Sequence, residues 1–349
     1  MFALRNEVSM CLKMTKPWNI FSLCNSSNCR FFGHAMLLVS LFWLTGCEQG
    51  IPAKKTYEHA AYGVYDAAIA SGLSFAVTAD FEDTAKLWST KSNKIRKVWQ
   101  MGKQKQPIIS VAISGDNKRV LTASEHLISL WDVRTGKNLG AWSLEDTILS
   151  VTLSFDGTKA VIGQRSNQAV LFDFKRGGIA AIFPHEHWVH AVAINLKGSY
   201  VLTGSDDYTV KLWRVRDSKP IRTWKHKNRV RLVEFSPNGA LAVSAAENGQ
   251  LKLWNIKKGK LLKTLDKKRT AITAAVFSRN SKYLATGSTR GLIQLWDMKT
   301  GKVSRQWQAK AREKWPPSGV VIRALGFSKD GKLLLSESSN GLAQLWKAR

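Results

Sequence analysis

The sequence predicts an all-β fold in which seven similar units of four short antiparallel strands follow one another along the chain. Three observations predict it. The dipeptide Leu-Trp, replaced once by Leu-Phe, recurs seven times at intervals of 41 to 50 residues. Asn-Gly and Asp-Gly turns, which favour tight hairpins, separate short apolar segments within the intervals. All four cysteines lie at or before position 47, so the repeats have neither disulfides nor thiolate metal sites.

An apolar leader precedes the repeats. Residues 31–46 contain no Asp, Glu, Lys or Arg, and the run is shorter than a spanning helix requires. It ends in Leu44-Thr45-Gly46-Cys47, which resembles a bacterial lipobox, where cleavage precedes the cysteine and its thiol carries diacylglycerol. We expect residues 1–46 to be a lipoprotein signal peptide and residues 47–52 to be a lipidated cysteine with a short tether. An ordinary signal peptide or short membrane anchor is the alternative, and the long segment before the run leaves the translation start open.

The resemblance to a lipoprotein implies a lipid-anchored protein of the cell envelope that faces the periplasm. Glu48 follows the lipidated cysteine. Because Glu48 is not the aspartate associated with inner-membrane retention in enteric bacteria, the outer membrane is favoured over the inner membrane.

The chain is strongly basic. Its formal charge is +28, of which residues 1–47 contribute +3 and the remainder therefore +25. Such an excess favours anionic partners, such as acidic protein, phospholipid, polysaccharide or nucleic acid, without choosing among them. A generally basic, soluble surface is the alternative.

Each repeated unit divides into four predicted strands. In the fifth unit these are Val230–Phe235, Leu241–Ser244, Leu251–Trp254 and Leu261–Leu265. Four such strands cannot bury both faces of their sheet alone. Packed radially, however, the sheets cover one another, and closure of the ring protects most sheet edges.

Two Trp-Asp pairs, Trp131-Asp132 and Trp296-Asp297, and the segment from Gly204 to Trp213 resemble the WD40 repeat. The resemblance implies a seven-bladed WD40-type β-propeller over residues 53–349. It also implies a structural role for the aromatic residue that ends the third strand of each blade. These residues are Trp88, Trp131, Phe172, Trp213, Trp254, Trp296 and Trp346.

The WD40 family can also form a hydrogen-bonded network inside a blade from a histidine, a serine or threonine, an aspartate and the tryptophan. By this resemblance only the fourth unit completes the network, with His185, Ser205, Asp207 and Trp213. Other residue types stand near the aspartate position in other units, so we expect most networks to be incomplete.

The last unit lacks a fourth strand, because the sequence stops at Arg349 directly after the third. The segment Ala53–Tyr57 precedes the first full unit and can supply it. We therefore expect this N-terminal strand to close the last blade, and the closed ring to be monomeric.

Inner-strand spacing predicts which residues face the central channel. By resemblance to such propellers, the connections from one blade to the next lie on the top face. A step of three and then two between apolar residues implies a β-bulge. The residue after the first apolar position should then turn toward the top mouth. These seven residues are Tyr65, Ile109, Leu149, His190, Arg231, Thr273 and Arg323.

The top loops of the later blades add basic residues and one tryptophan beside two prolines. Together with the mouth they form a candidate site for a partner protein with an acidic or partly apolar segment, which Arg231 and Arg323 would orient. Trp315 is a candidate anchor, with packing on its own blade as the alternative. The basic loop residues are Lys225, Lys227, Arg229, Lys267, Lys268 and Arg269.

The bottom face is expected to lie near the membrane. If Ala53–Tyr57 is the outer strand, it starts at the bottom, and five residues reach at most about 18 Å back to Cys47. The third-to-fourth-strand turns on that face hold four acids, Asp132, Asp173, Asp217 and Asp297. Each basic group near an anionic surface contributes about 1 kcal/mol; simple solvation is the alternative. The fourteen bases are Lys91, Lys94, Arg134, Lys137, Lys175, Arg176, Arg214, Arg216, Lys219, Lys257, Lys258, Lys260, Lys299 and Lys302.

No motif for catalysis, phosphate binding or dinucleotide binding occurs. The cluster His185-Glu186-His187 with His190 is the one pattern that suggests a metal. His185 already has a structural role, however, and neither a fixed carboxylate ligand nor a carboxylate partner for His190 is evident. We therefore predict no metal, no cofactor and no catalysis.

We thus expect a non-catalytic protein-interaction scaffold, anchored to the membrane and facing the periplasm, with nucleic acid not expected as a partner. One alternative is a lipoprotein that binds polyanions or senses the cell envelope. The other is a propeller hydrolase or oxidoreductase, which would need several titratable groups converging at the mouth.

Overall fold

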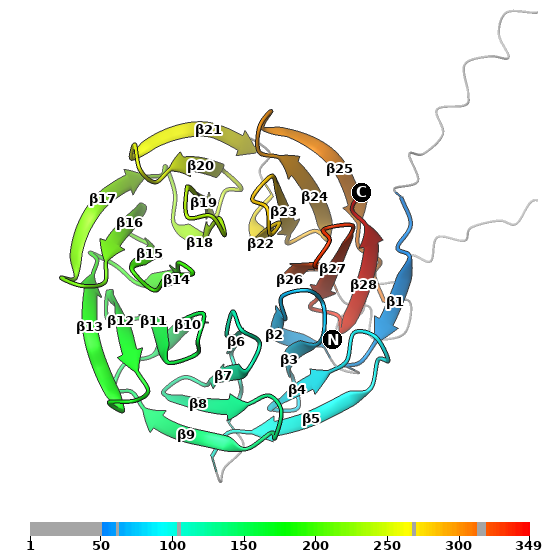
Figure 1. Ribbon diagram of the computed structural model, residues 1–349, viewed down its shortest axis with the longest axis horizontal. Helices are drawn as coiled ribbons and strands as arrows, with labels where there is room; N and C mark the ends of the chain where they lie inside the picture. Colours follow the sequence, from blue (N-terminus) through cyan, green and yellow to red (C-terminus); the bar gives the residue numbers. More distant parts are fainter. Residues whose placement is uncertain (1–50, 61–62, 103–105, 267–269, 313–318) are drawn as a thin grey trace, which may run out of the picture. The chain divides into compact units, whose positions relative to one another are not determined.

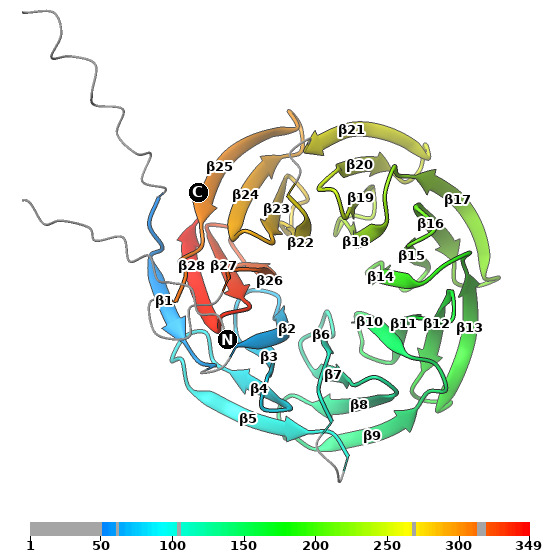
Figure 2. The ribbon, with the colours of Figure 1, turned by 180° about the vertical axis from the view of Figure 1, so that it is seen from behind.

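The computed structural model describes residues 51–60, 63–102, 106–266, 270–312 and 319–349, all within the unit Gln49–Arg349. Their 28 strands form seven four-stranded antiparallel sheets, arranged as blades around a central axis (Figures 1 and 2). The predicted seven-bladed β-propeller is confirmed. The described part of the chain contains no helix. A helical membrane span is accordingly not found within it.

The first six blades each use four consecutive strands, from the inner to the outer edge. Blades one to three consist of β2 (Val64–Ile69), β3 (Ala76–Asp80), β4 (Thr84–Trp88), β5 (Ile95–Gln100), β6 (Ser110–Ile113), β7 (Arg119–Ala123), β8 (Leu127–Asp132), β9 (Asn138–Ser143), β10 (Ile148–Leu153), β11 (Lys159–Gln164), β12 (Gln168–Asp173) and β13 (Gly178–Pro184). Blades four to six consist of β14 (Val189–Ile194), β15 (Tyr200–Ser205), β16 (Thr209–Arg214), β17 (Lys219–Lys225), β18 (Val230–Phe235), β19 (Leu241–Ala246), β20 (Leu251–Asn255), β21 (Lys260–Asp266), β22 (Ile272–Phe277), β23 (Tyr283–Ser288), β24 (Leu292–Asp297) and β25 (Lys302–Gln308).

Blade seven combines strands that are far apart in sequence. It contains β26 (Ile322–Phe327), β27 (Leu333–Ser338), β28 (Leu342–Lys347) and, on its outer edge, β1 (Lys55–Glu58). β1 pairs antiparallel with β28, from Lys55 opposite Leu345 to Glu58 opposite Leu342 (Figure 1). The Tyr57 ring is buried 5.9 Å from the Trp88 ring of blade one. This strand therefore also contacts the neighbouring blade.

The core lies between neighbouring blades, and the repeated aromatic residue of every third strand is buried in it. In five blades the indole Nε1 of this tryptophan donates to a Ser or Thr hydroxyl of the second strand at 2.8–2.9 Å. Each such tryptophan thus buries a large ring and satisfies its polar N–H. The donor–acceptor pairs are Trp131–Thr122, Trp213–Thr203, Trp254–Ser244, Trp296–Thr286 and Trp346–Ser336.

The fourth blade contains the predicted network, but with a different hydroxyl. His185 Nδ1 lies 2.7 Å from Asp207 Oδ2, and His185 Nε2 lies 2.6 Å from Thr203 Oγ1, which accepts from Trp213. The prediction of Ser205 was wrong. Ser205 lies at the end of β15, where it donates to the His187 carbonyl and accepts from the Asp207 N–H. Thr203 lies two residues deeper in the strand, within reach of the indole.

Burial lowers the pKa of His185, so the neutral ring donates to Asp207 and accepts from Thr203. Burial alone would raise the pKa of Asp207. Hydrogen bonds from His185 and Thr209 nevertheless hold it below its ordinary value. A partial network in the fifth blade was not predicted. There His226 Nε2 lies 2.7 Å from Ser244 Oγ, which also accepts from Trp254.

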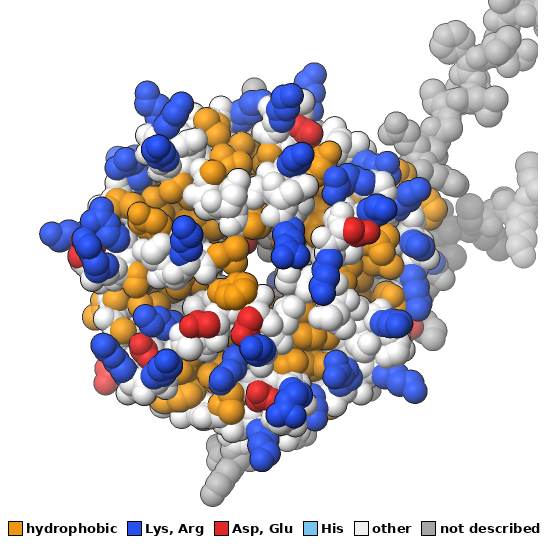
Figure 3. Space-filling model, in the orientation of Figure 1, with side chains coloured by type: hydrophobic (Ala, Val, Ile, Leu, Met, Phe, Trp, Pro, Cys, Tyr) orange, Lys and Arg blue, Asp and Glu red, His pale blue; other side chains and the backbone are white. Residues whose placement is uncertain are grey.

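Strand direction defines two faces of the ring. The connections between blades and the second-to-third-strand turns lie on the top face. The first-to-second and third-to-fourth turns lie on the bottom face, which Figure 3 shows. On this bottom face, Lys and Arg side chains are spread around the rim, hydrophobic side chains lie in patches between them, and a few charged side chains of both signs lie near the central opening (Figure 3).

Candidate interaction surface on the top face

Bulges in the inner strands place the predicted mouth residues. Register shifts occur at the expected position in six inner strands, which confirms the predicted bulge in those blades. In blade two, β6 begins only after that position, at Ser110. The apolar residue before each shift is buried, whereas the next residue is partly or fully exposed. The bulge therefore turns one side chain per blade out of the core.

Exposed apolar side chains gather in blades one and two. Tyr65 is 41% exposed, and its ring centroid lies 4.3 Å from that of Phe81, which is 48% exposed. Ile109 occupies the equivalent mouth position in blade two and is 36% exposed. We call Tyr65, Phe81 and Ile109 the apolar platform. Phe81 lies in the β3–β4 turn and was not predicted, although an aromatic residue in a polar turn is a visible signal.

Two other mouth residues contribute less than predicted. Leu149 is partly buried. The Thr273 hydroxyl donates to the Ile322 carbonyl of blade seven at 2.6 Å. Thr273 thus joins two blades and is not available as a binding group, which corrects its predicted role.

The mouth residues of blades four and five meet a carboxylate that was not predicted there. Asp206 Oδ1 lies 3.0 Å from Arg231 Nη1, and Asp206 Oδ2 lies 3.3 Å from His190 Nε2. The prediction that His190 has no carboxylate partner was therefore wrong. Asp206 belongs to the WD40-like segment of the sequence, but only the packing of β14 against β18 brings both His190 and Arg231 to it.

Arg231 is bound within the protein. Besides Asp206, it contacts Glu247 at 3.4 Å between Nη2 and Oε2, and Arg229 Nε lies 4.0 Å from Asp206. We call His190, Asp206, Arg229, Arg231 and Glu247 the charged cluster. Burial and the neighbouring Arg231 lower the pKa of His190, although Asp206 opposes them. The positive charges of the two arginines and the negative charges of the two carboxylates then cancel. The cluster therefore offers a partner little net charge.

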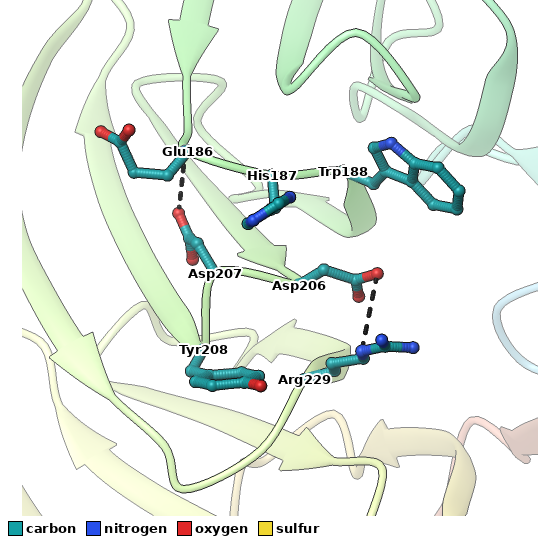
Figure 4. A pocket seen from close by; sticks show the side chains of 7 residues that line it. All are labelled: Glu186, His187, Trp188, Asp206, Asp207, Tyr208 and Arg229. Carbon is teal, nitrogen blue, oxygen red and sulfur yellow. Dashed lines mark hydrogen bonds and ion pairs between the residues drawn. The ribbon is translucent and has the colours of Figure 1, made fainter.

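A hollow of about 570 Å³ opens beside the charged cluster, between blades four and five (Figure 4). Figure 4 shows Asp207 facing the Glu186 segment on one side and Asp206 facing Arg229 on the other. The ring of Trp188 also lines the hollow, and the Arg165 guanidinium lies 4.2 Å from its centroid. Such a stack presents both a cation and a flat surface.

Tyr208 gives this hollow an unusual side chain. Its φ is +68°, a left-handed conformation that costs a bulky residue free energy. The equivalent turn positions in other blades hold residues that tolerate it, such as Asp83, Asn167 and Gly249. Tyr208 is 49% exposed, and the hydrogen bonds of Asp207 and Thr209 fix the turn around it. The blade-four network therefore holds a strained aromatic residue at the surface.

Family models match two stretches of the chain. The model described as WD domain, G-beta repeat matches residues 96–132 and 179–214. The model described as Anaphase-promoting complex subunit 4 WD40 domain matches residues 201–280. No curated protein matches the chain. The ring is a WD40 propeller.

The matches also explain how the WD40 propeller divides into repeats. Both G-beta matches begin near the start of an outer strand and end with the third strand of the following blade. The sequence repeat is thus offset by one strand from the blade. A WD40 repeat that ends at β28 therefore leaves blade seven without its outer strand. β1 occupies that outer position.

The basic top loops are only partly within the described residues. Lys225, Lys227 and Arg229 are exposed on the top face of the WD40 propeller. Three further predicted basic residues and the predicted anchor lie outside the described residues: Lys267, Lys268, Arg269 and Trp315.

Arg323 differs from Arg231 in its surroundings. Among the described residues of the WD40 propeller, no carboxylate forms an ion pair with it, and its buried Nε has no hydrogen-bond partner. Its positive charge acts to lower the pKa of Asp66, the residue that follows Tyr65. Burial raises the pKa of Asp66, which accepts from the Ser110 hydroxyl and the Val111 N–H. Arg323 is thus a partly exposed cation on β26, the inner strand that packs against β2 and therefore against the strand of Tyr65.

The histidine pattern does not form a metal centre in the described ranges. His185 is used inside the blade, and His190 binds Asp206. Within the described part of the WD40 propeller, no three His, Cys, Asp or Glu side chains converge in a way that could hold a metal ion.

Proposed function

We propose that the protein is a membrane-anchored, periplasmic WD40 propeller that acts as a non-catalytic interaction scaffold. Its top face would bind a partner protein through a segment that is partly apolar and acidic. Propellers with WD40 repeats generally mediate protein–protein interactions. The observation that carries the proposal is the exposed, mutually packed pair of Tyr65 and Phe81, in a blade whose inner strand β2 packs against β26, the strand of Arg323.

The apolar platform supports binding because its side chains are exposed and already ordered. Tyr65 and Phe81 pack on each other, so they lose little conformational freedom when a partner covers them. Arg323 is partly exposed and can pair with an acidic group of the same partner segment. Because Arg231 is already paired with Asp206 and Glu247, we assign the acid-binding role to Arg323 instead.

Anchoring rests on the sequence and on the position of Ile51. Cys47 and the leader lie outside the described residues. Ile51 lines a hollow with Asp330 and Lys332 of the β26–β27 turn, on the bottom face. Cys47 precedes Ile51 by four positions, so an anchor there would hold the bottom face near the membrane and leave the top face accessible.

Crosslinking in intact cells followed by mass spectrometry would identify the partner. Capture should then fall at least ten-fold in a Tyr65→Ser/Phe81→Ser variant and in Arg323→Glu. Both changes affect exposed or partly exposed positions, so the thermal unfolding midpoint should change little. Unchanged capture in both variants would contradict the proposed site.

Binding of polyanions is the second candidate function, favoured by the charge of +28. Reversal of three exposed bases on the bottom face, Lys257, Lys258 and Lys260, separates the two. A specific partner should stay bound to this variant. If bottom and top variants lose capture equally, and capture falls steeply with salt, the polyanion function replaces the scaffold.

A further inference from the structure

Three adjoining hollows form a continuous groove on the bottom face. The central hollow, of about 590 Å³, lies where the first-to-second-strand turns surround the channel. It shares Arg279 and Lys329 with a second hollow, which shares Asp330 and Arg349 with a third. Ile51, close to the start of β1, lines the third hollow. The groove thus runs from Ile51 to the central opening.

The central end of the groove is apolar and contains no acid. Its lining includes Ile113, Phe155, Leu196 and Phe277, and the only charged residues among its lining are Arg279 and Lys329. Phe155 and Leu196 lie in the turns of blades three and four and are 48% and 53% exposed. Two large apolar side chains at turn tips beside a basic pair are unfavourable in water and suit an amphiphilic surface.

The outer part of the same face is basic all around the ring. Of the fourteen bases predicted in the third-to-fourth-strand turns, thirteen are exposed and Arg214 is partly buried. The four acids of these turns mostly cap their own turns, as Asp132 and Asp297 do with Thr135 and Thr300. Figure 3 shows Lys and Arg side chains all around the rim of this face.

We propose that the bottom face docks on an anionic lipid bilayer. Phe155 and Leu196 insert at the level of the headgroups, and Arg279, Lys329 and the turn bases bind lipid phosphates. This proposal rests on the proposed anchoring, which would bring this face to the membrane. A bilayer fits better than a peptide because the positive charge surrounds the whole face, whereas a peptide would need it along one groove.

Vesicle binding of the fragment 51–349 tests docking apart from anchoring. Every strand of the seven sheets lies within this fragment, and Cys47 does not. We expect it to sediment with phosphatidylglycerol-rich vesicles and not with pure phosphatidylcholine vesicles. Phe155→Ser/Leu196→Ser and Arg279→Glu/Lys329→Glu should each weaken binding at least ten-fold. Thermal unfolding of each variant checks that the ring is intact.

The matched control is Tyr65→Ser/Phe81→Ser on the opposite face, because Phe81 and Phe155 are equally exposed, at 48% each. The control should bind vesicles as the parent does. Equal loss in the control, equal binding to both kinds of vesicle, or no vesicle binding at all would overturn the proposal. Binding of an acidic, apolar peptide in place of vesicles would assign the groove to a protein segment. If Cys47 carries no lipid, the anchoring fails and the vesicle result still stands.

Discussion

At the scale of single residues, the top face combines a strained tyrosine with a network that holds it. Tyr208 adopts a φ of +68° where other blades place Asp, Asn or Gly. Because nothing in the hydrophobic core depends on this exposed ring, the conformation points to use of the side chain at the surface. The hollow beside it gives a partner a place to contact it.

Replacement of Tyr208 should stabilise the ring and weaken binding. The left-handed conformation costs a tyrosine about 1 kcal/mol, whereas asparagine tolerates it. The free energy of unfolding of Tyr208→Asn should therefore rise by about that amount. Urea unfolding measures it. Capture of the partner should fall in the same variant. A less stable Tyr208→Asn protein would show that the ring contributes to packing instead.

Acid should destabilise the fifth blade through His226. Burial lowers the pKa of His226 from an ordinary value of 6.5 to about 3. The unfolded chain therefore binds a proton more readily, and stability that is complete above pH 6.5 is lost as the pH falls toward 3. Substitution by a neutral residue, His226→Gln, should reduce the loss between pH 7 and pH 4 by about 2–3 kcal/mol.

Chemical unfolding at several pH values measures this effect. His126→Gln is a suitable control, because the His126 side chain is 48% exposed. The control should keep the pH dependence of the parent. If His226→Gln keeps it as well, the histidine does not carry the acid sensitivity.

The mouth residues could be predicted from the sequence, but their partners could not. A bulge depends on spacing along one strand, so six positions followed from the sequence alone. The pairing of Arg231 with Asp206 depends on how a turn of blade four meets the inner strand of blade five. The choice of Thr203 over Ser205 depends on the depth of the indole in the blade. Both contacts depend on how strands pack against one another, which the sequence of a single repeat does not specify.

At the scale of elements, the blades follow from short-range patterns. Leu-Trp strands and hairpin turns recur at nearly constant spacing, and each predicts a strand or turn within its own blade. β1 is different because its role depends on an edge formed hundreds of residues later. Its single buried side chain, Tyr57, reflects an edge strand that is covered on one side only.

Deletion of residues 52–58 should open the ring. The change removes β1, bares the outer edge of β28 and takes Tyr57 away from Trp88. We expect a markedly lower thermal midpoint and aggregation through the free edge. Differential scanning calorimetry and light scattering measure both. A chain that starts at Ile51 keeps β1 and is the control, and equal midpoints for the two chains would show that β1 contributes nothing to stability.

At the scale of the whole molecule, anchoring would decide which face meets which surroundings. The top and bottom faces differ in kind: one mixes aromatic residues with paired charges, and the other is broadly basic with an apolar centre. A tether on the bottom side would keep these two surfaces apart. It would also fix the direction in which a partner can approach.

Lipidation of Cys47 is the prediction that supports this arrangement. Intact-mass analysis of the protein isolated from membranes should show a chain that begins at acylated Cys47. Cys47→Ser should stall processing or release the protein from the membrane. A mature protein that retains upstream residues and an unmodified thiol would exclude a lipoprotein.

The pairing of β1 with β28 also means that β1 can pair only late in synthesis. Lys55 and its partner Leu345 are 290 positions apart, so the strand made first waits for nearly the entire ring before it finds its place. Closing so long a loop costs entropy and slows folding. A chain cut short before β28 would keep an unpaired strand at one end and an open edge at the other. Closure therefore acts as a length check, because only a chain translated through β28 can become a ring without free edges.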